Sequence, residues 1–243
     1  MENKTGKRKY TDLFIDFDDT LYDTYGNAVI ALRETFEACR LDRWFADPQL
    51  FFDAYWKANI ELWGQYSRGE ISRDYLIAER FRRPLMASGR WQGEGDDAQF
   101  PLHLSNVFLD FCSSKPGVTD GAHELMDYLR RKGYRMHLCS NGFHEVQYKK
   151  LDSCGLRGYF QTVVLSEDAG ANKPSEAFFD YALRTSGADR RTTLMIGDNI
   201  STDILGAQRA GLDTLLFNRW GAETNVIKPT YCVTSLREII HIL

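Results

Sequence analysis

The sequence predicts an α/β fold in which a doubly wound parallel sheet carries a helical cap domain, inserted after the first strand. From residue 113 onward, short apolar runs alternate with stretches of helical periodicity, a pattern typical of a parallel sheet covered on both faces. Residues 22–112 show helical stripes and almost no strand pattern. We therefore expect a core domain of residues 10–21 and 113–243, a cap of residues 22–112, and a disordered basic tail of residues 1–9.

The first strand is predicted at Leu13, where the segment LFIDFDDTL changes abruptly from apolar to acidic residues. A buried strand delivers polar groups at its carboxyl end in this way. Comparable apolar runs predict further strands at residues 134–139, 162–165, 193–196, 214–217 and 231–233.

Helices are predicted between these strands. Ala122, Leu125 and Leu129 fall at helical spacing before Gly133, and a second helix is expected to have Pro174 in its first turn. In the cap, Asp47 followed by Pro48 is a favourable helix start.

The charge balance of the chain argues against nucleic acid and membranes as partners. The 243 residues carry 34 acidic and 30 basic side chains, a formal charge of −4, with both signs mixed along the chain. This balance offers no basic surface for nucleic acid or an anionic membrane, so a small-molecule partner is expected. The chain has no apolar stretch long enough for a membrane span and no signal-peptide pattern, and its five cysteines form no CxxC pair. We expect a cytoplasmic protein with reduced thiols and leave its oligomeric state open.

Acidic residues follow two of the predicted strands. Asp16 and Asp18 come at the end of the first strand, and Asp198 and Asp203 follow the strand at 193–196. The carboxyl ends of parallel strands meet at one crevice, so Asp16, Asp18 and Asp198 are expected to lie together although they are remote in sequence. Carboxylate oxygens are the ligands that Mg²⁺ prefers, and Mg²⁺ is the predicted ion. Asp203 alone is also a reasonable cap for the helix that follows.

Two further segments suggest an anion site. Ser140 follows an apolar strand and opens a segment with helical pattern, so its hydroxyl and the amides of Asn141 and Gly142 could bind an anion. Ser140 could equally be a helix cap. Lys173 lies just before a predicted helix, where a cation opposes the helix dipole. A phosphoryl group beside clustered carboxylates is the partner expected to compensate that charge.

These four segments, in this order and at these strand ends, resemble the haloacid dehalogenase superfamily, whose usual members are Mg²⁺-dependent phosphatases. The segments HLCSNGFHEVQYKKLDSCGLRGYF, ANKPSEAFFDYAL and IGDNISTDILGAQRAGLDTLLFNRWG look like the branch that contains the pyrimidine 5′-nucleotidases. LWGQYSRGEIS in the cap is similar to the same branch.

The resemblance implies a role for each matching residue. Asp16 would be the nucleophile that takes the phosphoryl group, and Asp18 the acid and then the base. The Asp16 side chain, the Asp18 backbone carbonyl and the Asp198 side chain would hold Mg²⁺. Ser140, Asn141 and Lys173 would bind phosphoryl oxygens, and Asp203 would orient Lys173 or a metal-bound water.

The implied function is Mg²⁺-dependent hydrolysis of a small phosphomonoester through a phosphoaspartate, with a nucleoside 5′-monophosphate as the favoured substrate. An acid two residues after the nucleophile predicts rapid breakdown of the intermediate by water. A phosphomutase with the same core and a regulatory binder with little turnover remain alternatives.

The four core segments are expected to contact only the metal and the phosphate, so residues of the cap must determine which leaving group is accepted. Trp63, Trp91 and Tyr22 are candidates to stack on a nucleobase, although aromatic residues at helical spacing are more often core. Arg80, Arg82 and Arg83 could attract an anionic substrate, but a solvated helix face is the favoured interpretation.

Overall fold

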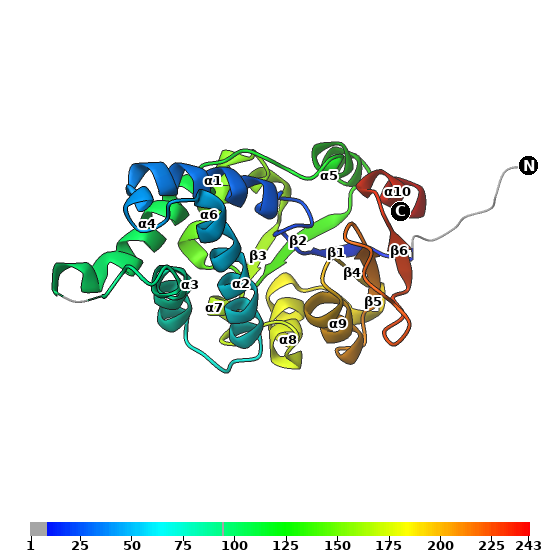
Figure 1. Ribbon diagram of the computed structural model, residues 1–243. Coiled ribbons are helices and arrows are strands. Elements are labelled where there is room, and N and C mark those ends of the chain that lie inside the picture. Colours follow the sequence, from blue (N-terminus) through cyan, green and yellow to red (C-terminus); the bar gives the residue numbers. More distant parts are fainter. Residues whose placement is uncertain (1–8, 94) are drawn as a thin grey trace, which may run out of the picture. The chain divides into compact units, whose positions relative to one another are not determined.

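The computed structural model describes residues 9–93 and 95–243, and the chain divides into two compact units. One unit contains the residues up to Thr24 together with Gly117–Leu243, and the other is Tyr25–Pro116 (Figure 1). The unit boundaries therefore fall at residues 24–25 and 116–117, where the sequence predicted 21–22 and 112–113. Of the predicted basic tail, residues 1–8 lie outside the described part. Lys9 is described, and its ammonium pairs with the Asp213 carboxylate at 2.9 Å.

The first unit is built on a parallel sheet of six strands in the order β3-β2-β1-β4-β5-β6. This confirms the predicted fold class, because the chain builds outward from β1 first on one side and then on the other. β1 begins one residue before the predicted Leu13, and the five strands with predicted bounds begin and end within one residue of them. The bounds are β1 Asp12–Ile15, β2 Arg135–Ser140, β3 Thr162–Leu165, β4 Thr193–Gly197, β5 Asp213–Phe217 and β6 Tyr231–Val233.

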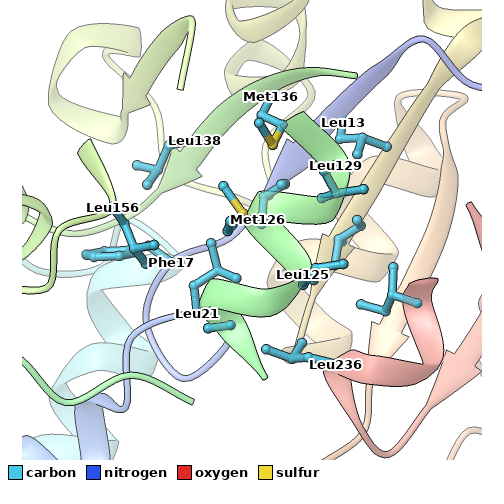
Figure 2. Close-up of a cluster of buried hydrophobic side chains, with 14 of the residues drawn as sticks. Leu13, Phe17, Leu21, Leu125, Met126, Leu129, Met136, Leu138, Leu156 and Leu236 are labelled. Atoms are coloured by element: carbon cyan, nitrogen blue, oxygen red, sulfur yellow. The ribbon is translucent and has the colours of Figure 1, made fainter. Parts of the chain in front are cut away.

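Helices cover both faces of this sheet (Figure 1). Alternation along β1 sends Leu13 and Ile15 into the apolar cluster under α5, α6 and α10, and Phe14 into the cluster under α8 and α9. Figure 2 shows the first cluster, to which α5 contributes Leu125, Met126 and Leu129 and β2 contributes Met136 and Leu138. The helices of this unit are α5 Ala122–Arg131, α6 His144–Ser153, α7 Ser166–Ala169, α8 Glu176–Ser186, α9 Leu205–Arg209 and α10 Leu236–Ile242.

The second unit is helical, and its long helices are α1 Thr24–Ala38, α2 Pro48–Ser67, α3 Arg73–Ala87 and α4 Phe100–Ser113. Asp47 caps α2 by accepting a hydrogen bond from the Gln49 amide at 2.9 Å, and Pro48 is the first helical residue, as predicted. Within the described residues, no helix combines the length and the apolar character that crossing a membrane requires.

One arginine and two aromatic residues that the sequence analysis considered for substrate contacts are buried. Arg80 is buried, at 2% exposure, and donates from Nε and Nη2 to the Ser105 hydroxyl, so the prediction of a solvated face is wrong for this residue. Trp91 and Tyr22 are also buried, at 4% and 0%, and belong to the cores of the cap and sheet units respectively. Side chains that fill a core cannot offer a free ring face to a base.

Candidate active site

Lys173 lies at the centre of a polar cluster at the carboxyl edge of the sheet. Its Nζ donates three hydrogen bonds of 2.7 Å, to Asp16 Oδ1, Asp203 Oδ1 and the Cys139 carbonyl. Burial alone would lower the pKa of this ammonium, but the two carboxylates outweigh burial and raise its pKa. The anions that compensate Lys173 in this structure are thus protein carboxylates. A phosphoryl oxygen can reach Nζ only by sharing or replacing one of these contacts.

The helix after Lys173 begins later than predicted. Ser175 caps α8 by accepting from the Ala177 amide at 3.3 Å, so Pro174 precedes the cap and is not in the first turn. Asn141 fixes the segment instead: its side chain accepts from the Lys173 amide at 2.8 Å and donates to the Lys173 carbonyl at 3.0 Å. Both polar groups of the Asn141 side chain are therefore used to hold the Lys173 backbone. If Asn141 binds a phosphoryl oxygen, it does so through its backbone amide.

Three carboxylates gather beside the ammonium. Asp16, Asp198 and Asp203 each offer an oxygen within 4.8 Å of the others. The Thr20 hydroxyl lies 3.0 Å from Asp16 Oδ2 and 3.3 Å from Asp198 Oδ1, and so links the first two. Thr20 can turn back toward Asp16 because Asp19, at φ 60°, closes a tight turn after β1.

Burial and mutual repulsion disfavour the ionised forms in this cluster. Burial raises the pKa of Asp16 to about 7, and the nearby Asp203 adds to the effect while Lys173 opposes it. Burial, followed by repulsion from Asp16 and Asp203, also raises the pKa of Asp198 well above its usual range. The cluster holds more negative charge than one ammonium offsets.

Asp203 is placed by the turn that follows β4. Its Oδ2 accepts from the Asn199 amide at 3.1 Å, and Asn199 itself caps the π-helical turn η5 (Ile200–Ile204). The reading of Asp203 as a helix cap is therefore wrong, because Asn199 has that role. Gly197 allows the approach, since a Cβ there would collide with the Asp203 carboxylate.

Asp18 has a different environment from Asp16. Its Oδ1 accepts from Lys150 Nζ at 2.5 Å and from the Thr24 hydroxyl at 2.7 Å, and its Oδ2 accepts from Gln147 Nε2 at 2.5 Å. Burial would raise the pKa of Asp18, but Lys150 and these hydrogen bonds outweigh burial and lower its pKa. The side chain keeps 29% of its surface exposed.

Lys150, Gln147 and Thr24 were not singled out by the sequence analysis. Gln147 and Lys150 lie three residues apart on α6, so they share a helix face, between the buried apolar residues Val146 and Leu151. Two polar residues at this spacing on a buried face, directly after the Ser140 strand, are the signal that could have found them.

Ser140 is the last residue of β2 and not a helix cap, because α6 begins at His144. Its hydroxyl oxygen accepts from the Gly142 amide at 3.0 Å and from Gln147 Nε2 at 2.6 Å. Through Gln147 the predicted phosphate residue Ser140 is connected to Asp18. The geometry thus brings Asp16, Asp198, Asp203 and Lys173 into one cluster and joins Ser140 to Asp18.

Comparison with known proteins agrees with this arrangement. The family model for haloacid dehalogenase-like hydrolases matches residues 13–211, which include every residue of the cluster. The chain belongs to the haloacid dehalogenase-like hydrolases. The prediction that it is an enzyme of this superfamily is confirmed.

Three relatives of this hydrolase match over nearly the whole chain. It is 33% identical over 239 residues to the HAD-hydrolase YfnB of Bacillus subtilis, covering 97% of this chain and 96% of the relative. It is 30% identical to the pyrimidine 5′-nucleotidase PynA of Streptococcus pneumoniae (96% and 95% covered) and 32% identical to the pyrimidine 5′-nucleotidase YjjG of Escherichia coli (97% and 98% covered). The predicted resemblance to the nucleotidase branch is therefore confirmed.

A crystal structure of Bacillus subtilis YfnB matches this hydrolase with a TM-score of 0.83 at 31% identity, covering 98% of this chain and 99% of that one. That structure is described as bound to magnesium and as revealing interdomain movement. The similarity extends the family assignment from sequence to fold.

The acidic cluster of this hydrolase fits a divalent cation. Three carboxylates against one ammonium leave two negative charges when all are ionised, and their oxygens are hard ligands. Burial, together with repulsion between these carboxylates, raises the pKa values of Asp16 and Asp198, so the protein groups alone do not stabilise both ionised forms. A bound cation of charge +2 would balance it.

We expect Mg²⁺ to stabilise this protein more at about pH 8 than at about pH 5.5. The pKa of Asp16 in the folded protein is about 7, above its ordinary value, so below that pH the native carboxyl holds a proton that the metal must displace. The rise in melting temperature on adding Mg²⁺, measured by calorimetry at both pH values, checks this. An equal rise at both would show that Asp16 does not compete for proton and metal.

Proposed function

We propose that this hydrolase is a Mg²⁺-dependent phosphatase that acts on nucleoside 5′-monophosphates through a phosphoaspartate on Asp16. The observation that carries the proposal is the pair of carboxylates two residues apart in opposite environments. Asp16 is buried against Lys173, and Asp18 is partly exposed and held by Lys150, Gln147 and Thr24. Two acidic groups kept in different environments can divide the roles of nucleophile and proton carrier.

In the first step the Asp16 carboxylate attacks phosphorus, the bond from phosphorus to the leaving oxygen breaks, and Asp18 gives that oxygen its proton. In the second step Asp18 takes a proton from water as the water oxygen attacks phosphorus, and the bond to Asp16 breaks to release phosphate. The lowered pKa of Asp18 in the free protein suits the second step. The negative charge of an arriving phosphate raises that pKa and so supports the first.

Lys173 keeps the nucleophile in place. Its bond to Asp16 Oδ1 and that of Thr20 to Oδ2 fix both carboxylate oxygens, so the group cannot rotate freely. The Asp16 and Asp198 side chains, with the Asp18 backbone carbonyl, would hold Mg²⁺. When bound, that ion would offset the charge of the phosphoryl oxygens and of the carboxylates.

The nucleotide preference is supported by PynA and YjjG, whose names give them pyrimidine 5′-nucleotidase activity. The test is a panel of nucleoside 5′-monophosphates and sugar phosphates, with phosphate release ranked by kcat/KM in Mg²⁺. We expect pyrimidine nucleotides to rank above sugar phosphates by about tenfold or more, equivalent to roughly 1.4 kcal/mol of transition-state binding. Equal rates across the panel would contradict the nucleotide preference. An isomerised sugar phosphate without free phosphate would indicate a mutase, and tight binding without turnover a regulatory binder.

A further inference from the structure

One helix holds both oxygens of the Asp18 carboxylate. Lys150 Nζ binds Oδ1 and Gln147 Nε2 binds Oδ2, each at 2.5 Å, from positions three residues apart on α6. Thr24, at the start of α1, adds a third bond to Oδ1 at 2.7 Å. With both oxygens bound from separate points of a rigid helix, the plane of the carboxylate is set by α6.

Lys150 is buried for this contact. The residue is 7% exposed, and its ammonium lies 5.1 Å from the ring centre of Tyr22, a fully buried side chain. Taking an ammonium out of water costs free energy that a buried ion pair often fails to recover, so such a pair is weak evidence of a purely stabilising role. The preceding residue, Lys149, is exposed, which shows that the same helix can place a lysine in solvent.

Gln147 connects the same carboxylate to the predicted phosphate site. Its Nε2 lies 2.5 Å from Asp18 Oδ2 and 2.6 Å from the Ser140 hydroxyl. Gly142 makes room for this amide, because a Cβ at that position would collide with the Gln147 side chain. Moving α6 would therefore displace Asp18 and Ser140 together.

We propose that Lys150, supported by Gln147, is a positioning residue that aims the Asp18 carboxylate at the leaving-group oxygen and then at the attacking water. The proposal rests on the function proposed above, in which Asp18 carries the proton. Lys150 itself neither gives nor takes a proton: the proton passes from Asp18 to the leaving oxygen, and later from water to Asp18. Only steps that move this proton depend on the aim of the carboxylate.

The experiment compares two substrates in Lys150→Met. A nucleoside 5′-monophosphate has an alkoxide leaving group that needs a proton, whereas p-nitrophenolate leaves without one. Because kcat/KM reports the steps up to transfer of the phosphoryl group, we expect it to fall roughly 10- to 100-fold for uridine 5′-monophosphate and to change by less than about threefold for p-nitrophenyl phosphate. We expect kcat to fall for both substrates, because hydrolysis of the phosphoaspartate also uses Asp18.

Lys149→Met is the matched control, and we expect it to leave both kcat/KM values unchanged. Gln147→Leu removes the other bond to Asp18 and also the bond to Ser140. We therefore expect a loss of kcat/KM common to both substrates and, on top of it, a further loss for uridine 5′-monophosphate, so this variant carries the test if Lys150→Met does not fold. Equal losses of kcat/KM for the two substrates, or no loss, in a folded variant would overturn the positioning role. Asp18→Asn separates the two proposals. Full nucleotide hydrolysis in this variant would contradict the proposed function. If the variant is inactive, the proposed function stands, and the two substrates in Lys150→Met decide the positioning role alone.

Discussion

Replacing Asp16 with asparagine is expected to lower phosphate release by about 10⁴-fold or more, because the amide cannot form the phosphoaspartate. The side chain has nearly the same shape, so the Thr20 and Lys173 contacts can persist around it. Steady-state release of phosphate from p-nitrophenyl phosphate in Mg²⁺ measures the loss. Full activity in Asp16→Asn would exclude this residue as nucleophile.

The same variant should remain folded. Burial raises the pKa of Asp16 to about 7, which means that the folded protein disfavours its charge relative to the unfolded chain. Removing that charge should therefore leave the melting temperature of the metal-free protein unchanged or raise it near pH 8. Asp152→Asn is a suitable control, because Asp152 is 56% exposed and paired with Arg157 on the surface. A large loss of stability in Asp16→Asn would mean that its inactivity reports unfolding.

Strand positions and the acidic cluster could be predicted from the sequence for the same physical reason. A buried parallel strand is a short apolar run, and the polar residue that ends it marks the carboxyl edge of the sheet. Asp16 after β1 and Asp198 after β4 therefore meet, although 182 positions separate 16 from 198. The two residues meet because β1 and β4 are neighbours in the sheet, and this cannot be deduced from their spacing in the sequence.

Side chains whose role depends on the face of a helix were harder to predict. Lys150 is one of two adjacent lysines, and only its position on the helix face shared with Gln147 and Leu151 distinguishes it from its exposed neighbour Lys149. Arg80 shows the opposite error: a basic run looks solvated, but the first residue of it turns inward to Ser105. Helix periodicity gives the relative angle of residues, whereas the packing partner decides which angle is buried.

Lys173→Met is expected to affect both stability and activity. Asp16 and Asp203, at 6% and 1% exposure, would lose the ammonium that binds both, and removing one partner of a buried ion pair costs about 3–5 kcal/mol. Activity should fall by roughly 10³-fold. Asp16 loses the contact that positions it, and the phosphoryl group loses the cation beside it. Denaturant unfolding and phosphate release measure the two effects. Lys9→Met removes an exposed pair with Asp213 and should cost no more than about 1 kcal/mol.

A second substitution separates the two effects of Lys173→Met. Adding Asp203→Asn removes one of the two carboxylates that repel each other, so the double variant should recover roughly 0.5–3 kcal/mol relative to the sum of the single changes. Activity should not recover, because the cation beside Asp16 is still missing. Additive losses in unfolding free energy would show that Lys173 and Asp203 are not coupled, contrary to their 2.7 Å contact. Recovery of activity along with stability would mean that Lys173 matters only for folding, and that the charge beside the nucleophile must come from another group.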